Sequence, residues 1–504
     1  MAETATGHDA NRLGERYLVG SPISGAGDES WLRNGDQYRQ SLRDNRTVLL
    51  DGRIVGDVTA EPTLRRGIDT LARYYDAQLD PMSQDALTTI DPETGKRFST
   101  AWLVPRSIAD LKRYDAMIRH STYQTFGVFG RPPDYGPVKA ISFVAWNHLI
   151  RASEPDALEK MLQFIDTGKR NNLLSADVII DVQGDRTLPI PERASRLRVI
   201  EERRDGVVLT GAKAGSSVFS QGNIGSISMP PPHPTMPEEC AIWAAIPADA
   251  PGLRMVLRGP LTTGAENAED HPLDFQGEES DGILLFDRVF VPWDHVFSYK
   301  NKAVIGLYTT LGQFAFWKIA TRLSYRAQIF AGAAQMIVDA LGTSGIPAVR
   351  AMVAEVLAYA ATLRGMMDAA IENAQPTESG VFLPHHVYVT AGRLHSLENY
   401  PRIMQLLRDL SGQGLISRVP HATWERSDVG ATLDSYLPGH GLSARDKNRL
   451  FNLIWDMTCS PHAMRVALFE NLNATPAPAL REELYRSYDR SDGLAAIRRQ
   501  AGID

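Results

Sequence analysis

The chain has 504 residues, of which 43% are hydrophobic and 22% are charged, and its formal net charge is −7. Such a length and composition predict an ordinary globular protein of two or three domains, and the negative charge argues against nucleic acid as a partner. The only cysteines, Cys240 and Cys459, are too few for a disulfide framework, a thiolate zinc site or a cysteine-ligated iron-sulfur cluster, so we expect no metal.

The N-terminal part of the chain is predicted to be mostly helical. It has no signal-peptide pattern, and no apolar run is long enough to cross a membrane, so a cytoplasmic protein is expected. Apolar residues at helical spacing occur in residues 63–79, 108–117 and 157–164. Between the last two segments, TFGVFGRPPDYGP at residues 125–137 breaks the pattern in a manner typical of an active site. We assign residues 1–174 to this domain.

A change from helical to β-rich pattern near residue 178 predicts a second domain. Short strands separated by Gly, Pro and Asp turns indicate a β-sandwich or small barrel over residues 175–302. Residues 283–291 predict a half-buried strand that Pro292 ends. The polar loop before this strand contains His271. A loop positioned by a rigid strand is a common place for a catalytic group. The alternative is that His271 is a solvated surface histidine.

The last part of the chain is predicted to be a helix bundle over residues 303–504. Helices are expected at residues 347–373, 387–410, 444–457 and 463–472. Helices, then strands, then long antiparallel helices form the order of an α+β, acyl-CoA dehydrogenase-like fold. Neither a phosphate loop nor HExxH occurs, and no GxGxxG follows a predicted strand, so any redox cofactor must be held in another way.

Six motifs, taken in order, carry a resemblance to a known family. They are RPPDY at 131–135, GAK at 211–213, DHPL at 270–273, FDRVFVPW at 286–293, YPR at 400–402 and FEN at 469–471. The chain resembles the oxygenase component of two-component flavin monooxygenases, the 4-hydroxyphenylacetate 3-monooxygenase family. DHPL and FENLN are more similar to its chlorophenol 4-monooxygenase branch. The resemblance covers roughly residues 35–495.

This resemblance implies an FADH2-dependent aromatic hydroxylase. Such enzymes take reduced FAD from a separate NAD(P)H-dependent flavin reductase, form a flavin C4a-hydroperoxide with O2, and add one oxygen atom to a phenol-like or hydroxypyridine-like ring. Electrophilic transfer favours a phenolate, which needs a general base and a cation. The resemblance also implies a homotetramer. An acyl-CoA dehydrogenase-type flavin dehydrogenase and a non-catalytic flavin-binding paralogue remain as alternatives.

The resemblance also implies roles for individual residues. His271 corresponds to the base, Arg131 to the arginine that holds the phenol oxygen, and Tyr135 to a substrate-binding tyrosine of the hydroxyphenylacetate branch. Asp177 stands where that branch has a histidine. An aspartate donates no hydrogen bond at neutral pH unless its pKa is raised, so contacts there must differ, or Asp177 faces solvent. The substrate could be a compact phenol, a halophenol, a hydroxypyridine or a decorated natural-product ring.

Three segments correspond to flavin-binding parts of the family. The first holds flavin through its backbone and an arginine, the second hydrogen-bonds the ring, and the third is a weaker match to a C-terminal cofactor-binding segment. In chain order their residues are Gln183, Gly184, Asp185 and Arg186; Ser216 and Ser217; and Cys459, Ser460, Pro461 and His462.

Overall fold

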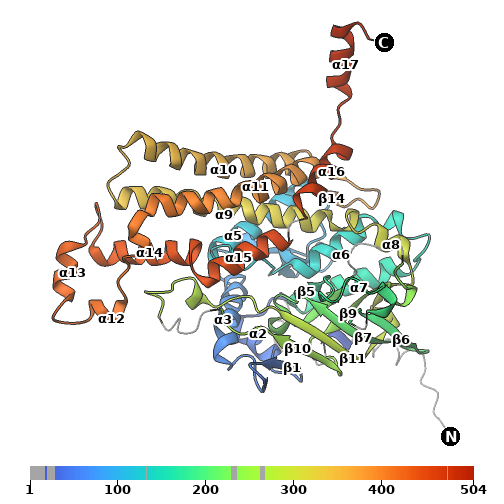
Figure 1. Cartoon of the computed structure of the whole chain (residues 1–504). Coiled ribbons are helices and arrows are strands. Elements are labelled where there is room, and N and C mark those ends of the chain that lie inside the picture. Colours follow the sequence, from blue (N-terminus) through green and yellow to red (C-terminus); the bar gives the residue numbers. More distant parts are fainter. Residues whose placement is uncertain are drawn as a thin grey trace.

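The computed structural model describes residues 17–19, 29–131, 133–193, 195–228, 235–261, 267–473 and 475–503. N-terminal helices are followed by two main β-sheets and then by a bundle of long helices (Figure 1). This order confirms the expected acyl-CoA dehydrogenase-like fold. No helix in the described ranges is both long and apolar enough to span a bilayer.

The three N-terminal helices expected from apolar spacing are present. They are α3 (Pro62–Ala77), α5 (Ile108–Gln124) and α7 (Ala157–Arg170). Helix α3 starts at Pro62. Proline is tolerated there because the N–H groups of a first helical turn have no acceptor within the helix. The helix buries Leu64, Ile68 and Leu71 on one face. Shorter helices in this region are α2 (Gly35–Ser41) and α4 (Gln84–Leu87).

The larger sheet has six strands in the order β2-β1-β10-β11-β7-β6. Two of its strands come from the N-terminal part, where β1 runs parallel to β10. The strands are β1 (Thr47–Leu50), β2 (Arg53–Val55), β6 (Arg198–Glu202), β7 (Gly206–Ala214), β10 (Leu253–Leu257) and β11 (Gly282–Pro292). The β domain therefore contains strands from before residue 174, and the expected boundaries at 174 and 302 stay a prediction.

A second sheet has four strands in the order β12-β9-β8-β5. They are β5 (Ser175–Val178), β8 (Ile224–Ile227), β9 (Ile242–Pro247) and β12 (Val296–Tyr299). Two small hairpins, β3 (Thr88–Ile90) with β4 (Arg97–Ser99) and β13 (Gln375–Pro376) with β14 (Phe382–Leu383), lie outside both sheets.

Strand β11 is the half-buried strand expected from residues 283–291. Leu284 and Phe286 are buried, and after a bulge Val289 and Val291 are buried again. Arg288 within the bulge has a φ of 56°. The extra residue returns the apolar side chains to the inner face, so the alternation continues across the irregularity.

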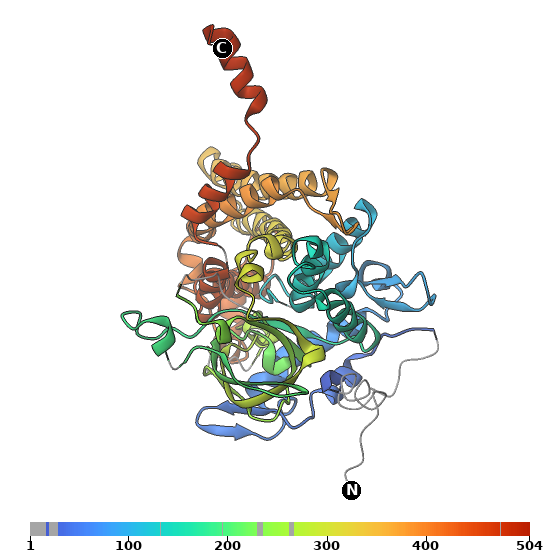
Figure 2. The same cartoon turned by 90° about the vertical axis from the view of Figure 1, so that its right-hand side faces the viewer.

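Three long helices form the C-terminal bundle and lie side by side (Figure 1). They are α9 (Gln313–Ala340), α10 (Pro347–Glu372) and α11 (His386–Ser411). The remaining helices are α6 (Tyr135–Ala145), α8 (Lys302–Gly306), α12 (His421–Trp424), α13 (Gly430–Tyr436), α14 (Ala444–Thr458), α15 (Pro461–Asn473), α16 (Ala477–Ser487) and α17 (Ser491–Ala501). Helix α17 projects from the body and buries none of its residues (Figures 1 and 2).

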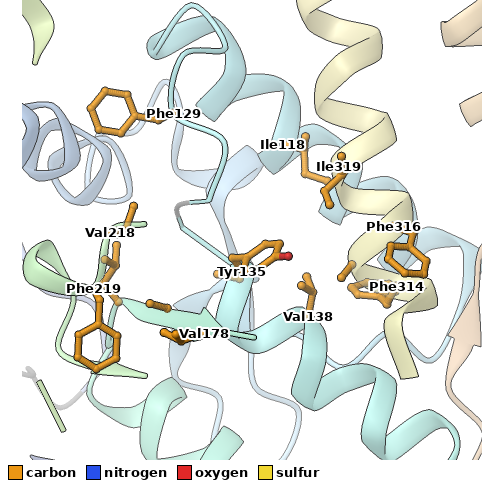
Figure 3. Packing of buried hydrophobic residues seen from close by; sticks show 14 of the residues in the cluster. Ile118, Phe129, Tyr135, Val138, Val178, Val218, Phe219, Phe314, Phe316 and Ile319 are labelled. Carbon is orange, nitrogen blue, oxygen red and sulfur yellow. The ribbon is translucent and has the colours of Figure 1, made fainter. Parts of the chain in front are cut away.

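Helix α6 occupies the junction between the sheets and the bundle. It packs on β5 and on α9, and all eleven of its residues are buried. Figure 3 shows Tyr135 at its first turn, between Val178 and Val218 on the sheet side and Ile319 on α9. A side chain on α6 therefore faces the interior, where a polar group needs a partner.

Candidate active site

The loop that leads into α6 is fixed by one buried lysine. Lys318 of α9 donates hydrogen bonds to the carbonyl oxygens of Gly130 (2.7 Å) and Arg131 (3.1 Å). Its ammonium also lies 3.1 Å from Oδ1 of Asp134. The glycine-proline break is thereby held in one conformation, which places the Arg131 side chain at the start of α6.

Arg131 is stacked between two aromatic rings. Its guanidinium carbon lies 3.7 Å from the ring centroid of Tyr135 and 5.0 Å from that of Phe469 on α15. The backbone N–H of Arg131 donates to Oε1 of Glu279 at 2.6 Å. Both Arg131 and Tyr135 are buried. Since a cation over an aromatic ring gains about 2 kcal/mol where water is excluded, this stacking orients the guanidinium firmly.

Asp177 lies on β5 beside this pair and is 5% exposed. Ser228 donates a hydrogen bond of 3.2 Å to its Oδ1, whereas its Oδ2 has no hydrogen-bond partner among the described residues. Burial raises the pKa of Asp177, against the opposing charges of Lys139 and Arg131. The structure thus brings Arg131, Tyr135 and Asp177 together, and a protonated Asp177 would be able to donate a hydrogen bond.

His271 belongs to a second group of side chains. Its Nδ1 lies 3.7 Å from Oδ1 of Asp456, a fully buried residue of α14, while the His271 side chain is 31% exposed. Burial, together with the nearby charge of Asp274, raises the pKa of Asp456. Ligand atoms of His271, Asp274 and Asp456 all lie within 4.8 Å of one another, so this group could also hold a metal ion.

The segment at residues 459–462 adjoins the His271 group. It forms the turn from α14 to α15, where the Ser460 hydroxyl accepts a hydrogen bond from the N–H of Ala463 at 3.1 Å. Nδ1 of the buried His462 lies 3.1 Å from Oδ1 of Asp274. Pro461 begins α15, and Cys459 is half-buried with its Sγ 3.3 Å from the Thr458 hydroxyl. These contacts connect residues 459–462 to the loop that carries His271.

The two serines after β7 differ in their hydrogen bonding. Ser217 donates to Oδ1 of Asp281 at 2.6 Å. The hydroxyl of Ser216 is buried and has no hydrogen-bond partner in the described part of the chain. Gly215 precedes it with a φ of 62°, a conformation that favours glycine. A buried hydroxyl without a partner fits a polar ligand such as a flavin ring.

The first of the three predicted flavin-binding segments is separate from these groups. Gln183, Gly184, Asp185 and Arg186 lie in an exposed loop after β5. Asp185 accepts hydrogen bonds from the backbone N–H and the hydroxyl of Thr187, which stabilises the turn locally. No hydrogen bond or ion pair between this loop and the other predicted site residues occurs within the described ranges.

Sequence reasoning missed a buried ion network centred on Arg465 of α15. Arg465 donates to Asp281 at 2.7 and 2.8 Å and to Oε2 of Glu279 at 3.2 Å. Burial acts to raise the pKa of Asp281, but Arg465, together with Ser217 and Arg258, outweighs it and the pKa is lowered. Because Asp281 accepts from Ser217 and Glu279 from Arg131, the network links two predicted site segments. No local pattern signals it, since its members lie far apart in the sequence.

Comparisons with known proteins identify the family of the chain. The model of the 4-hydroxyphenylacetate 3-hydroxylase N-terminal domain matches residues 34–298, and that of its C-terminal domain matches residues 306–502. The oxygenase component of a 4-nitrophenol 4-monooxygenase/4-nitrocatechol 2-monooxygenase from Rhodococcus opacus is 31% identical over 88% of this chain and 86% of its own. The FADH2-dependent monooxygenase TftD from Burkholderia cepacia is 28% identical over 88% of this chain and 87% of its own.

Solved structures give the same assignment. The oxygenase component of 4-hydroxyphenylacetate 3-monooxygenase complexed with FAD and 4-hydroxyphenylacetate aligns with a TM-score of 0.86 and 25% identity, over 93% of this chain and 99% of that one. An archaeal 4-hydroxybutyryl-CoA dehydratase from N. maritimus shares the fold, with a TM-score of 0.84 and 22% identity over 94% of this chain and 95% of that one. The chain belongs to the 4-hydroxyphenylacetate 3-hydroxylase family.

Proposed function

We propose that this protein is the oxygenase component of a two-component, FADH2-dependent monooxygenase that hydroxylates a phenol-like or hydroxypyridine-like ring. The observation that carries the proposal is the buried group of Arg131, Tyr135 and Asp177 at the junction of α6 and β5. A fixed cation beside two hydroxyl-type donors is suited to a phenolate oxygen, because it stabilises negative charge where water is excluded.

Each member of this group has a proposed role toward the aromatic substrate. Arg131 holds the phenolate oxygen by charge, and Tyr135 hydrogen-bonds the same oxygen. Asp177 acts in its protonated form, which burial favours by raising its pKa. Reduced FAD, when bound, supplies the activated oxygen atom from O2. The residues of the chain orient the ring, exclude water and manage the proton of the phenol.

His271 is proposed to be the base that removes the phenol proton. Asp456 lies 3.7 Å from its Nδ1, so Nε2 is the ring nitrogen that we propose to take the proton. Flavin contacts are proposed for Ser216 and Ser217, for the exposed loop at residues 183–186, and for residues 459–462. The partnerless Ser216 hydroxyl is the feature that supports the flavin assignment.

We further propose the partners that such an oxygenase requires. They are a separate NAD(P)H-dependent flavin reductase, a small aromatic substrate and three further copies of the chain in a homotetramer. The net charge of −7 supports no role for nucleic acid, and a cytoplasmic location fits the proposed dependence on a diffusing reduced cofactor.

The test is a reconstituted assay. The purified chain is combined with a flavin reductase, NADH, FAD and a panel of hydroxyaromatics, and products are identified by the mass of one added oxygen. We expect oxygenated product only when reductase, flavin and a hydroxyaromatic are all present. Robust NADH oxidation by the isolated chain, or peroxide as the sole product with every ring tested, would overturn the proposal.

A further inference from the structure

Lys213 is a buried lysine that connects the two main sheets. It belongs to β7 of the larger sheet and is 0% exposed. Its ammonium donates hydrogen bonds to the carbonyl oxygens of Ile179 (2.8 Å) and Ser228 (3.2 Å) and to Oδ1 of Asp181 (2.8 Å). An ammonium has three donors, so every donor of Lys213 is used, which offsets the cost of burying its charge.

The two carbonyl groups occupy equivalent positions on neighbouring strands of the smaller sheet. Strands β5 and β8 run parallel, and their last paired residues are Val178 and Ile227. Ile179 and Ser228 come directly after these two residues. A buried carbonyl beyond the end of a ladder still needs a donor, and Lys213 supplies one to both. Lys213 therefore caps the carboxyl ends of β5 and β8 together.

This cap fixes the proposed substrate side of the site. Asp177 lies on β5 just before the capped end. The Ser228 hydroxyl donates to Oδ1 of Asp177 at 3.2 Å, and the N–H of Ser228 donates to the carbonyl oxygen of Val178 at 3.1 Å. Ser228 thus accepts from Lys213 and donates to Asp177. A shift of Ser228 would move the contact that holds the Asp177 carboxyl group.

Lys213 is also connected to two of the segments that we propose for flavin binding. Ser216 and Ser217 follow it in the turn after β7. On the other side, Asp181 forms an antiparallel bridge with Lys213, and the loop at residues 183–186 follows Asp181 along the chain. The three hydrogen bonds of one ammonium therefore join the strand that carries Asp177 to the starting points of both flavin-side segments.

The relative position of ring and flavin decides how well oxygen is transferred, because a misplacement of about 1 Å can cost about 100-fold in rate. Resting on the proposed function, we infer that Lys213 is a positioning residue, which caps β5 and β8 and thereby sets Asp177 relative to the flavin-side segments. It acts through Ser228 and Asp181 rather than by contact with a ligand.

Lys213→Met tests this role in the reconstituted assay, with the hydroxyaromatic that the panel identifies as substrate. We expect product formation to fall about 10- to 100-fold. The KM for the hydroxyaromatic should rise and the product-to-peroxide ratio should fall, while oxygen uptake continues. Amide hydrogen exchange, followed by mass spectrometry, gives a readout that needs no activity. Exchange should become faster in peptides that contain residues 177–186 and 226–228, and stay parent-like elsewhere.

Arg196→Met is the matched control. Its guanidinium lies 3.1 Å from Oδ2 of Asp181, so the variant removes a cation from the same cluster and leaves all three acceptors of Lys213 in place. It should keep the KM and the product-to-peroxide ratio of the parent protein. An equal loss in Arg196→Met would mean that the stability of the ion cluster, and not the cap, determines the result, and the inference would fail.

Lys213→Arg covers the case in which Lys213→Met does not fold. It keeps the charge beside Asp181, but a planar guanidinium cannot direct three hydrogen bonds from one nitrogen, so we expect an intermediate product-to-peroxide ratio. Parent-like coupling and exchange in Lys213→Arg would refute the positioning role.

The results also separate this inference from the proposed function. If the parent protein oxygenates no ring, but exchange rises at residues 177–186 in Lys213→Met, the hydroxylase assignment is wrong and the cap stands. If the parent protein hydroxylates its ring and Lys213→Met does so with the same KM and coupling, only the role of Lys213 is wrong.

Discussion

Nδ1 of His271 lies 3.7 Å from Oδ1 of Asp456, and the other carboxylate oxygen accepts from the backbone N–H groups of Leu273 (3.0 Å) and Asp274 (3.4 Å). One buried carboxylate therefore holds the backbone of the loop by hydrogen bonds and lies beside the imidazole that the loop carries, at a distance too long for a hydrogen bond. This arrangement resembles a histidine oriented by an acid, in which the partner of one ring nitrogen decides which atom is available for chemistry.

The Asp456→Asn variant tests this orientation. An asparagine keeps an acceptor for the two backbone N–H groups but loses the negative charge beside His271. We expect product formation to fall about tenfold or more, with a displaced pH–rate profile and nearly unchanged flavin binding. If product formation and the pH–rate profile both match those of the parent protein, Asp456 only stabilises the loop and does not affect His271. A rise in thermal stability on adding Zn²⁺ or Mn²⁺ to the parent would indicate a metal site instead.

His271→Ala should suppress hydroxylation while oxygen uptake continues as hydrogen peroxide release. A positioned base contributes on the order of 10²–10⁴-fold, so the loss in product should fall in that range. Raising the pH above the pKa of the substrate phenol should restore part of the rate, because the substrate is then ionised without help. The ratio of product to peroxide, measured from pH 6 to 10, provides the check; a parent-like ratio at neutral pH refutes the base assignment.

Sequence patterns predicted those helices that have one apolar face. Helices α3, α5, α10 and α14 bury a single stripe, and the expected segments at residues 63–79, 108–117, 347–373 and 444–457 all fall on them. Helices α6 and α9 were not predicted. Both are buried on nearly all sides, and a helix that is apolar all round has no periodic pattern to detect. The element that carries Tyr135 and Lys139 was therefore missed, although its entry loop was predicted.

Site residues that lie in a family motif could be predicted from the sequence. Site residues that are brought together only by tertiary packing could not. Arg131, Tyr135 and His271 lie in the motifs RPPDY and DHPL. Asp456 and Arg465 lie in helices whose sequences give no sign of an ion network, and their partners are more than 180 residues away. Only the three-dimensional packing of α14 and α15 against residues 271–281 brings them together.

Arg131→Ala should weaken the binding of a phenolate by about 1.5–3 kcal/mol, because the charge-assisted contact to its oxygen is lost. Arg131→Lys should recover only part, since the planar guanidinium that stacks at 3.7 Å on Tyr135 is absent. Substrate affinity is measured by titration of the reductase-free protein. Arg402→Lys, which alters an exposed pair with Glu355, serves as the control. Normal affinity in Arg131→Ala would make the RPPDY break purely structural.

Asp177→Asn should change how stability depends on pH. Burial raises the pKa of Asp177 in the folded protein, so its contribution is fully present below the unfolded pKa and is lost as the pH rises through the folded value. An asparagine at position 177 cannot ionise, so the free energy of unfolding of the variant should fall less as the pH rises through the folded-state pKa of Asp177. Urea denaturation at a series of pH values compares the two proteins. Parallel curves would show that Asp177 ionises in the fold without penalty.

Arg465→Met should be among the most destabilising single changes in the chain. Arg465 is the shared partner of Asp281 and the fully buried Glu279, so its removal leaves Glu279 without an ion-pair partner among the described residues and leaves Asp281 with Arg258 alone. Breaking a buried ion pair in this way typically costs 3–5 kcal/mol, and we expect a loss of about that size in urea denaturation. Arg254→Met removes the exposed pair with Asp287 and should cost at most about 1 kcal/mol.

Arg465→Met should also weaken FAD binding. Asp281 accepts a hydrogen bond from the Ser217 hydroxyl and so stabilises the turn that contains Ser216. The pH dependence gives an independent check. The pKa of Asp281 is lowered in the fold, so the stabilisation is present above the unfolded pKa and is lost as the pH falls through the folded value. Arg465→Met should show a smaller acid-side loss, because Arg258 and Ser217 still act on Asp281. If its stability, acid sensitivity and FAD affinity all match those of Arg254→Met, the network around Arg465 does not support the flavin-side turn.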